Sequence, residues 1–163
     1  MAATDIFERL IQDHDKHRAM IEAIEQTKGD TPERRSLYEA FKIEATAHAS
    51  SEEVTLYATL MGEVKMREYA QHAAKDHHEI TDAFKATDEV DFGSTGWLAS
   101  FRAVKDTYLD HIKEEEKTIF PDALKDLGKA KAVELKDAYN AIKPEEIERA
   151  ESGADDKIAE KIG

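Results

Sequence analysis

Apolar residues recur along this chain at the three- and four-residue steps of amphipathic helices. Leu37, Phe41 and Leu56 follow these steps, for example. His48 and Glu52 occur in the same stripe. Long stretches lack both glycine and proline, which a chain of β-strands and tight turns would need. The pattern predicts helices over residues 5–28, 31–62, 63–86 and 95–121, and a fifth helix over 129–142.

The ends of these segments carry residues that start or stop helices. Thr31 can cap a helix with its hydroxyl group, and Pro32 suits the first helical position. Pro121 is expected to kink or end the fourth helix, because proline has no amide hydrogen and clashes with the preceding turn. Pro144 is expected to stop the fifth helix for the same reason. Residues from 143 onward are expected to form a short docked helix or to fray.

Four long helices with short connections predict an all-α fold. Such connections bring consecutive helices together in opposite directions, which gives an up-down-up-down antiparallel four-helix bundle. A C-terminal helical extension follows the bundle. The length of 163 residues favours one domain. We assign residues 1–128 to the bundle and residues 129–163 to the extension and tail of the same domain.

Composition excludes several classes of protein. The chain has 23 basic and 36 acidic side chains and a formal net charge of −13, which argues against binding to nucleic acids or anionic membranes. It has no cysteine, so disulfides, thiolate zinc sites and cysteine-ligated iron–sulfur clusters are excluded. No apolar run approaches the roughly 18 residues of a membrane span. The first residues do not resemble a secretory signal, so we expect a cytoplasmic protein.

An internal repeat of 63 residues organises the polar positions of the expected core. Three pairs of residues share this offset: His14 and His77, His48 and His111, and Glu52 and Glu115. Their neighbours agree as well, because Asp13 corresponds to Asp76 and Glu53 to Glu116. The repeated unit is therefore a helix pair, with His on its first helix and His-x-x-x-Glu on its second.

This spacing predicts a metal site. Residues i and i+4 lie on one helix face, roughly 6 Å apart, so a histidine and a glutamate so placed can face one ion. Two helix pairs related by an approximate twofold axis would bring four imidazoles and two carboxylates to one level of the core. Two cations could then each take two histidines, with Glu52 and Glu115 as bridges. Iron, manganese and zinc all suit this mixture of donors.

A simpler interpretation is that each His-x-x-x-Glu pair only supports its helix. A single histidine in an amphipathic helix is more often a packed residue than a ligand. That interpretation leaves charged groups in apolar stripes, where an unpaired buried carboxylate costs several kcal/mol in rough terms. Metal ions would remove that cost, so the repeat favours the metal site.

Other familiar sites do not fit. Ferritin-type bundles use Glu-x-x-His pairs, and no histidine here has glutamate three positions before it. The chain also lacks the His-Glu-x-x-His zinc motif and a glycine-rich phosphate loop. Trp97 and Phe101, one turn apart, are expected in the core.

The chain resembles the hemerythrin-like family with its HHE cation-binding domain. The resemblance covers about residues 5–125 and rests on four segments: Asp13-His14, HASSEEVTLY from His48, DHHEI from Asp76 and HIKEEEKTIFP from His111. It implies a four-helix bundle around a non-haem diiron centre, bridged by two carboxylates and often by an oxo or hydroxo group. The ligands that it implies are His14, His48, Glu52, His77, His111 and Glu115.

The chain departs from this family at one position. Hemerythrins usually have a further histidine one turn before the third-helix histidine, and here that position is Ala73. His72 and His78 are out of helical phase with His77, although a π turn could redirect His72. Three tyrosines are candidates to replace the missing ligand: Tyr57, Tyr69 and Tyr108. His17, one turn from His14, is expected to pack against a ligand or to hydrogen-bond to one.

The family resemblance implies binding of small ligands, since its members carry or sense dioxygen, bind nitric oxide, detoxify peroxide or store and sense iron. We therefore expect a diiron protein that binds or reacts with a small diatomic ligand or peroxide. The alternative is a metal- or redox-responsive regulatory bundle without catalysis, in which residues 129–163 bind an unknown protein partner. A bundle without metal is the third interpretation. The sequence does not decide whether the protein is an enzyme.

Overall fold

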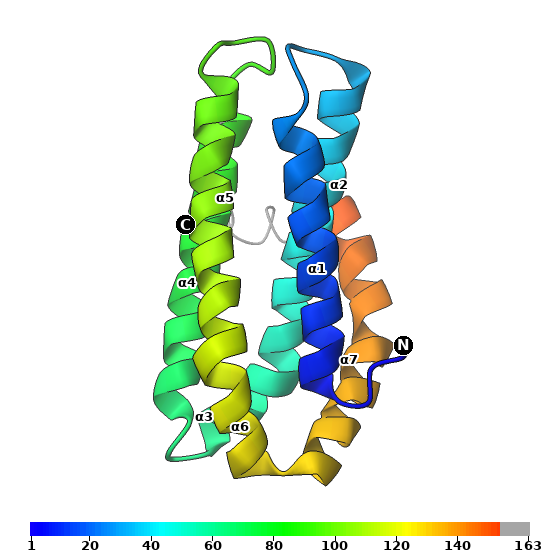
Figure 1. Cartoon of the computed structure of the whole chain (residues 1–163), viewed down its shortest axis with the longest axis vertical. Helices are drawn as coiled ribbons and strands as arrows, with labels where there is room; N and C mark the ends of the chain where they lie inside the picture. The colour runs from blue at the N-terminus through cyan, green and yellow to red at the C-terminus, as the bar shows by residue number, and fades with distance from the viewer. Residues whose placement is uncertain (154–163) are drawn as a thin grey trace.

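Helices make up most of the computed structural model, which describes residues 1–153. The α-helices are α1 (Ile6–Glu25), α2 (Pro32–Glu52), α3 (Ala58–Gly62), α4 (Arg67–Asp88), α5 (Trp97–Glu114), α6 (Phe120–Leu127) and α7 (Lys129–Glu151). Two π-helical turns are η1 (Glu53–Tyr57) and η2 (Glu115–Ile119). Figure 1 shows α1, α2, α4 and α5 running up and down side by side, with α7 beside them. The predicted all-α bundle with a C-terminal helical extension is confirmed.

The first two helices begin where the sequence predicts, and a side chain caps each. The Asp5 carboxylate accepts a hydrogen bond from the amide of Glu8 at 2.9 Å. The Thr31 hydroxyl accepts one from the amide of Arg34 at 3.1 Å. Each cap satisfies an amide that has no carbonyl partner within its helix.

The two π turns interrupt the long helices beside the repeated glutamates. η1 begins directly after Glu52, and η2 begins at Glu115 itself. Each turn continues into a further α-helix, so α2–η1–α3 and α5–η2–α6 are uninterrupted helical runs. A π turn contains one extra residue, and it therefore rotates the face that the following helix presents.

Two of the predicted helix ends are wrong. The fourth helical run continues past Pro121 to Leu127, because Pro121 directly follows the π turn η2, where the regular α-helical hydrogen-bond pattern is already interrupted. The fifth helix continues through Pro144 to Glu151. Lys143 and Glu146, on either side of this proline, are buried, and their packing outweighs the local preference to stop. Residues 154–163, the end of the predicted tail, lie outside the described residues.

The core has two apolar clusters with a polar layer between them. On α1, Ile6 and Leu10 belong to the first cluster and Ile21 and Ile24 to the second, and the histidines lie between these pairs. The same order holds in reverse along α2 and η1, where Phe41 belongs to the second cluster and Leu56 to the first. The first cluster is closed by η1, η2, α6 and α7, and the second lies toward the α1–α2 and α4–α5 loops.

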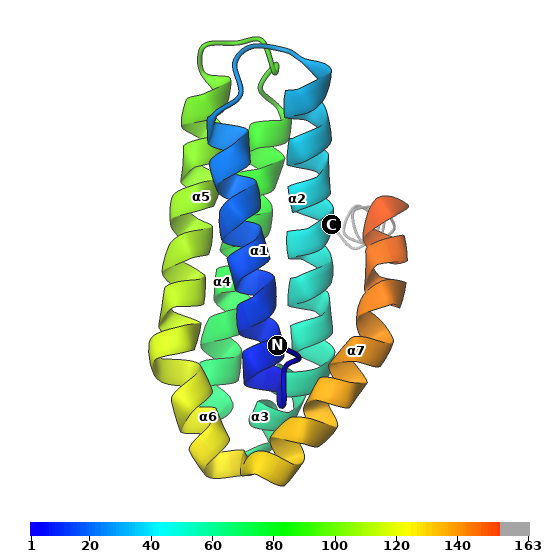
Figure 2. The same ribbon diagram turned by 45° about the vertical axis from the view of Figure 1, so that its right-hand side comes forward.

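Helix α7 covers one side of the bundle. It packs against α1 and α2 and contributes Leu135 and Tyr139 to the first apolar cluster. Figure 2 shows it rising along α2. The opposite side, formed by α4 and α5, has no such covering helix within residues 1–153. Over the same residues, no helix combines the length and the apolar character needed to cross a membrane.

Arg34 joins the two loops at the end of the bundle remote from α6. Its guanidinium donates to the side chain and to the carbonyl of Thr27, at 2.9 and 2.8 Å, and to the carbonyl of Phe92 at 2.7 Å. It also lies over the ring of Trp97, 4.7 Å from the centroid. Only the planar fork of arginine can serve these acceptors at once.

We predict that Arg34→Lys destabilises the protein by about 1–3 kcal/mol, because it leaves buried carbonyl groups without donors. Urea unfolding of the metal-free protein measures this change. Arg35→Lys is the matched control, since Arg35 is exposed, forms a salt bridge with Asp30 and lies over the ring of Phe92. Equal stability of both variants and the parent would contradict the role of Arg34.

Candidate metal centre

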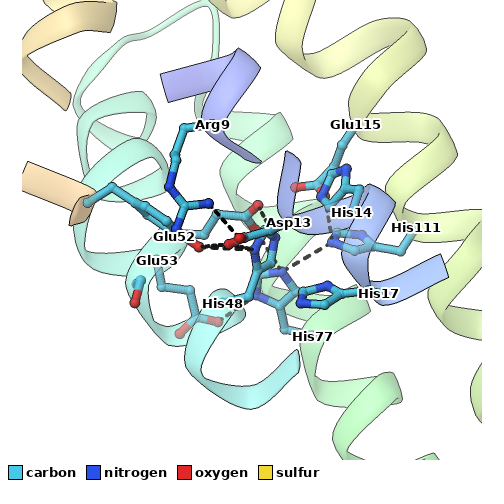
Figure 3. A network of polar contacts seen from close by, with 12 residues as sticks. Arg9, Asp13, His14, His17, His48, Glu52, Glu53, His77, His111 and Glu115 are labelled. Atoms are coloured by element: carbon cyan, nitrogen blue, oxygen red, sulfur yellow. Dashed lines mark hydrogen bonds and ion pairs between the residues drawn. The ribbon is translucent and has the colours of Figure 1, made fainter. Parts of the chain in front are cut away.

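The six residues of the repeat meet in the polar layer of the core. α1 and α4 each contribute one histidine, α2 and α5 each contribute another, and the glutamates stand at the start of the two π turns. All six are buried: His14, His48, Glu52, His77, His111 and Glu115. Figure 3 shows them converging from the four helices.

Each glutamate reaches one histidine from each half of the repeat. Glu52 has oxygens 3.0 Å from His48 Nε2 and 3.3 Å from His77 Nε2. Glu115 Oε1 lies 3.3 Å from His111 Nε2 and 3.4 Å from His14 Nε2. The donor atoms form two groups that share both glutamates, one with His14 and His48 and one with His77 and His111. Within each group the donor atoms lie within 4.8 Å of one another.

A carboxylate holds the outer nitrogen of every one of these histidines. Nδ1 of His48 lies 2.9 Å from Asp13, and Nδ1 of His111 lies 2.9 Å from Asp76. Glu116 and Glu53 serve His14 and His77 in the same way, at 2.7 and 2.9 Å. A donated Nδ1 hydrogen leaves the lone pair on Nε2, which faces the centre, and orients the ring.

These four carboxylates contact the candidate site, and the sequence analysis did not assign them to it. The signal was present, since Asp13 and Asp76, and Glu53 and Glu116, keep the 63-residue offset. Spacing along one helix could not reveal the contacts, because each carboxylate holds a histidine on a different helix.

The inner atoms of the cluster fit a metal. Within residues 1–153, five of the buried side-chain atoms that lack a hydrogen-bond partner belong to this cluster: Nε2 of His14 and of His48, both oxygens of Glu52, and Oε1 of Glu115. Nε2 of His77 and Nε2 of His111 lie 3.2 Å apart. If both nitrogens carry lone pairs, these repel each other at this distance. Unpaired buried polar atoms are costly, and cations at the centre would satisfy all of them.

The charges of the cluster lead to the same conclusion. Burial alone would lower the pKa of His48, but Glu52 and Asp13 raise it to about 9. The pKa of His77 is likewise raised to about 10 against burial, by Glu52 and Glu53. In the metal-free protein, protons on His48 and His77 therefore balance part of the carboxylate charge. Metal ions would replace these protons, so loading should release protons into solution.

Helix α7 is tied to the cluster through Asp13. The Lys143 amine donates to Asp13 Oδ2 at 2.8 Å and to Glu44 at 3.0 Å, and the Tyr139 hydroxyl donates to the same Asp13 oxygen. Burial disfavours the charged form of Asp13, but His48 and Lys143 hold its pKa well below its usual range. Asp13 thus links α7 to a histidine of the centre.

The other half of the repeat is more open at the equivalent place. Within residues 1–153, the hydrogen bond and ion pairs of Asp76 go to His111 and His72, and neither residue belongs to α7. The His72 side chain is 45% exposed and lies 2.9 Å from Glu114. α4 is a regular α-helix here, so no π turn redirects His72 and the structure does not bring it to the centre. His78 is exposed and pairs with Asp82.

His17 and Tyr108 form a buried pair beside the centre. His17 Nδ1 is hydrogen-bonded to the Tyr108 hydroxyl, and its ring packs edge-on against His48 at 5.2 Å. Burial lowers the pKa of His17 to about 4, so this imidazole is neutral. The expected packing of His17 against a candidate ligand is seen in these contacts.

The remaining tyrosines differ in their distance from the centre. The Tyr57 hydroxyl donates to Glu115 at 2.5 Å, and burial together with this carboxylate raises the pKa of Tyr57 well above its usual value. Tyr69 pairs with Asp122 outside the cluster. Ala73 is buried in the same apolar cluster as Tyr57. Of the three candidate tyrosines, only Tyr57 touches one of the six residues by a hydrogen bond.

Fold and site define a helical bundle with buried histidine and glutamate clusters able to hold metal ions. The model of the hemerythrin HHE cation binding domain matches residues 5–123, and the chain belongs to this family. A search of curated proteins found no match. A solved structure, the hemerythrin HHE cation binding domain-containing protein that is the Rv2633c homolog from Mycobacterium kansasii, shares the fold. It is 20% identical, with a TM-score of 0.80 over 93% of this chain and 92% of that chain.

We predict that Asp13→Asn weakens metal binding by about 10–100-fold, because it removes the charge that orients His48. The measurement is competition of the protein with a chelator of known affinity. Asp15→Asn is the control, since the Asp15 side chain is 70% exposed and forms a surface salt bridge with Arg18. Equal affinities of the two variants would contradict the role of Asp13.

Proposed function

We propose that this protein is a non-haem diiron protein that binds or reacts with a small ligand such as dioxygen, nitric oxide or peroxide. One observation supports this most directly: two groups of two histidines share Glu52 and Glu115. Each glutamate has oxygens within 3.4 Å of histidines from both halves. Such shared carboxylates are suited to bridge two ions.

Iron is proposed because the family resemblance implies it, and the donors also suit manganese or zinc. Bound iron would supply a Lewis-acidic and redox-active pair. Carboxylates of the protein hold the imidazoles in place. The two apolar clusters exclude water from both sides of the centre. With Ala73 in place of a further histidine, fewer protein ligands are available, which leaves positions for an added ligand. Tyr57 is the tyrosine best placed to approach them.

Anaerobic loading with ferrous iron tests the proposal. We expect about two irons per chain and a change in the optical spectrum on adding dioxygen, hydrogen peroxide or nitric oxide in separate experiments. Unfolded protein is the control for non-specific binding, and its metal content should stay at trace levels. A loaded protein whose spectrum responds to none of the three ligands would contradict this function.

We predict that His77→Ala lowers the iron content from about two per chain to about one, because it removes a ligand of one group only. Elemental analysis after anaerobic loading measures the content. His78→Ala is the matched control, being the adjacent histidine, exposed and paired with Asp82. Unchanged iron in the His77 variant would contradict the ligand set proposed here.

A regulatory bundle is the second candidate function, and the contacts of α7 favour it. Because Tyr139 and Lys143 bind Asp13, which holds His48, metal loading should change the stability of α7. We predict slower hydrogen exchange of α7 amides in the loaded protein, measured by mass spectrometry. Lys143→Met should remove this difference, whereas Lys131→Met, at an exposed position near the start of α7, should keep it.

A cytoplasmic location, the lack of nucleic-acid binding and any protein partner stay predictions.

A further inference from the structure

The 63-residue repeat makes two grooves between helices equivalent, but their residues differ. The repeat pairs α1 with α4 and α2 with α5, so the α2/α4 contact corresponds to the α1/α5 contact. At the α2/α4 contact the inward positions of α2 are small, Ala45 and Ala49. Their counterparts on α5 are Tyr108 and Ile112, which are both buried.

The α1/α5 contact is closed by its large side chains. Tyr108 crosses toward α1 and hydrogen-bonds to His17, which stands where the other half has Ile80. A surface groove of about 510 Å³ runs along α1 and α5, and its lining includes Ile21 and Leu109. None of the six residues of the centre lines it.

The α2/α4 contact is open to the centre. A surface groove of about 500 Å³ lies between α2 and α4, and Thr46, Ala49, His77 and Thr81 are among its lining residues. A smaller cavity of about 20 Å³ lies behind it and is lined by the same four residues. The small cavity also touches further residues of the core: Ala45, His48, Ile80, Phe84, Tyr108 and His111.

We propose that the small ligand reaches the metal centre between α2 and α4, through this inner cavity and from the side of the histidines, not that of Glu52 and Glu115. The proposal rests on the proposed function. Three of the four histidines line the cavity, and neither glutamate does. An added ligand that came through this cavity would therefore meet the histidine side of the cluster and not the carboxylate side.

The size and lining of the cavity define the ligand. A volume of about 20 Å³ holds little more than one water-sized group, for which roughly 10–15 Å³ suffices. Apart from the histidines, alanine, isoleucine and phenylalanine side chains make up much of its wall. A passage this narrow favours a small uncharged ligand and excludes an organic peroxide with a bulky group.

The repeat supplies the substitutions that test this route. Ala49→Ile and Thr46→Leu each copy the residue of the closed contact, since Ile112 and Leu109 are the counterparts. Both should narrow the passage and leave the six residues of the centre intact. Thr46 and Ala49 are half-buried, so the added atoms have room at the surface end and the fold should tolerate them. Ala103→Leu, at an exposed position of α5 outside both grooves, is the control.

The measurement is stopped-flow binding of nitric oxide to the anaerobic, ferrous-loaded full-length protein. We expect each narrowed variant to keep the iron content of the parent and to bind nitric oxide roughly tenfold more slowly or worse, and the control to match the parent. Parent-like rates in both narrowed variants, with iron content unchanged, would overturn the route while leaving the proposed function intact. A loaded parent protein that does not respond to nitric oxide, dioxygen or peroxide would overturn the proposed function and the route together.

Discussion

The structure depends on placing carboxylates and imidazoles in the middle of an apolar bundle. Each of the four histidines of the centre is held from outside by one carboxylate and meets a glutamate on its inner side. Such groups are costly to bury unless every one has a partner. The apolar clusters above and below exclude water, which strengthens each of these interactions. The five inner atoms without partners are the places where this requirement is not met by protein alone.

The approximate twofold repeat supplies these partners, because one helix pair used twice provides the complete set of histidines and carboxylates. The symmetry is then broken in two places. Helix α7 covers the half with Asp13 and supplies Tyr139 and Lys143 to it, whereas Asp76 in the other half stays close to solvent. Small residues open the α2/α4 contact, and the Tyr108–His17 pair closes the α1/α5 contact. A symmetric scaffold thus surrounds the centre unequally, which gives a ligand one side from which to approach.

Much of the fold and the six central residues could be predicted from the chain because both depend on local geometry. Residues at i and i+4 share a helix face whatever the helix packs against, so His48 and Glu52 were bound to point the same way. The helix capped by Thr31 began as predicted. The end at Pro144 was wrong, because Lys143 and Glu146 gain partners and burial only when α7 lies on the bundle.

The sequence by itself determined the helices, the repeat and the six residues that face inward, since each is a property of spacing along one chain segment. Only the tertiary structure decided which carboxylate holds which histidine, because Asp13 and His48 lie on different helices. It also decided that α7 runs on through Pro144 and that His72 stays at the surface. These contacts join residues distant in sequence, and they depend on how helix faces pack in three dimensions.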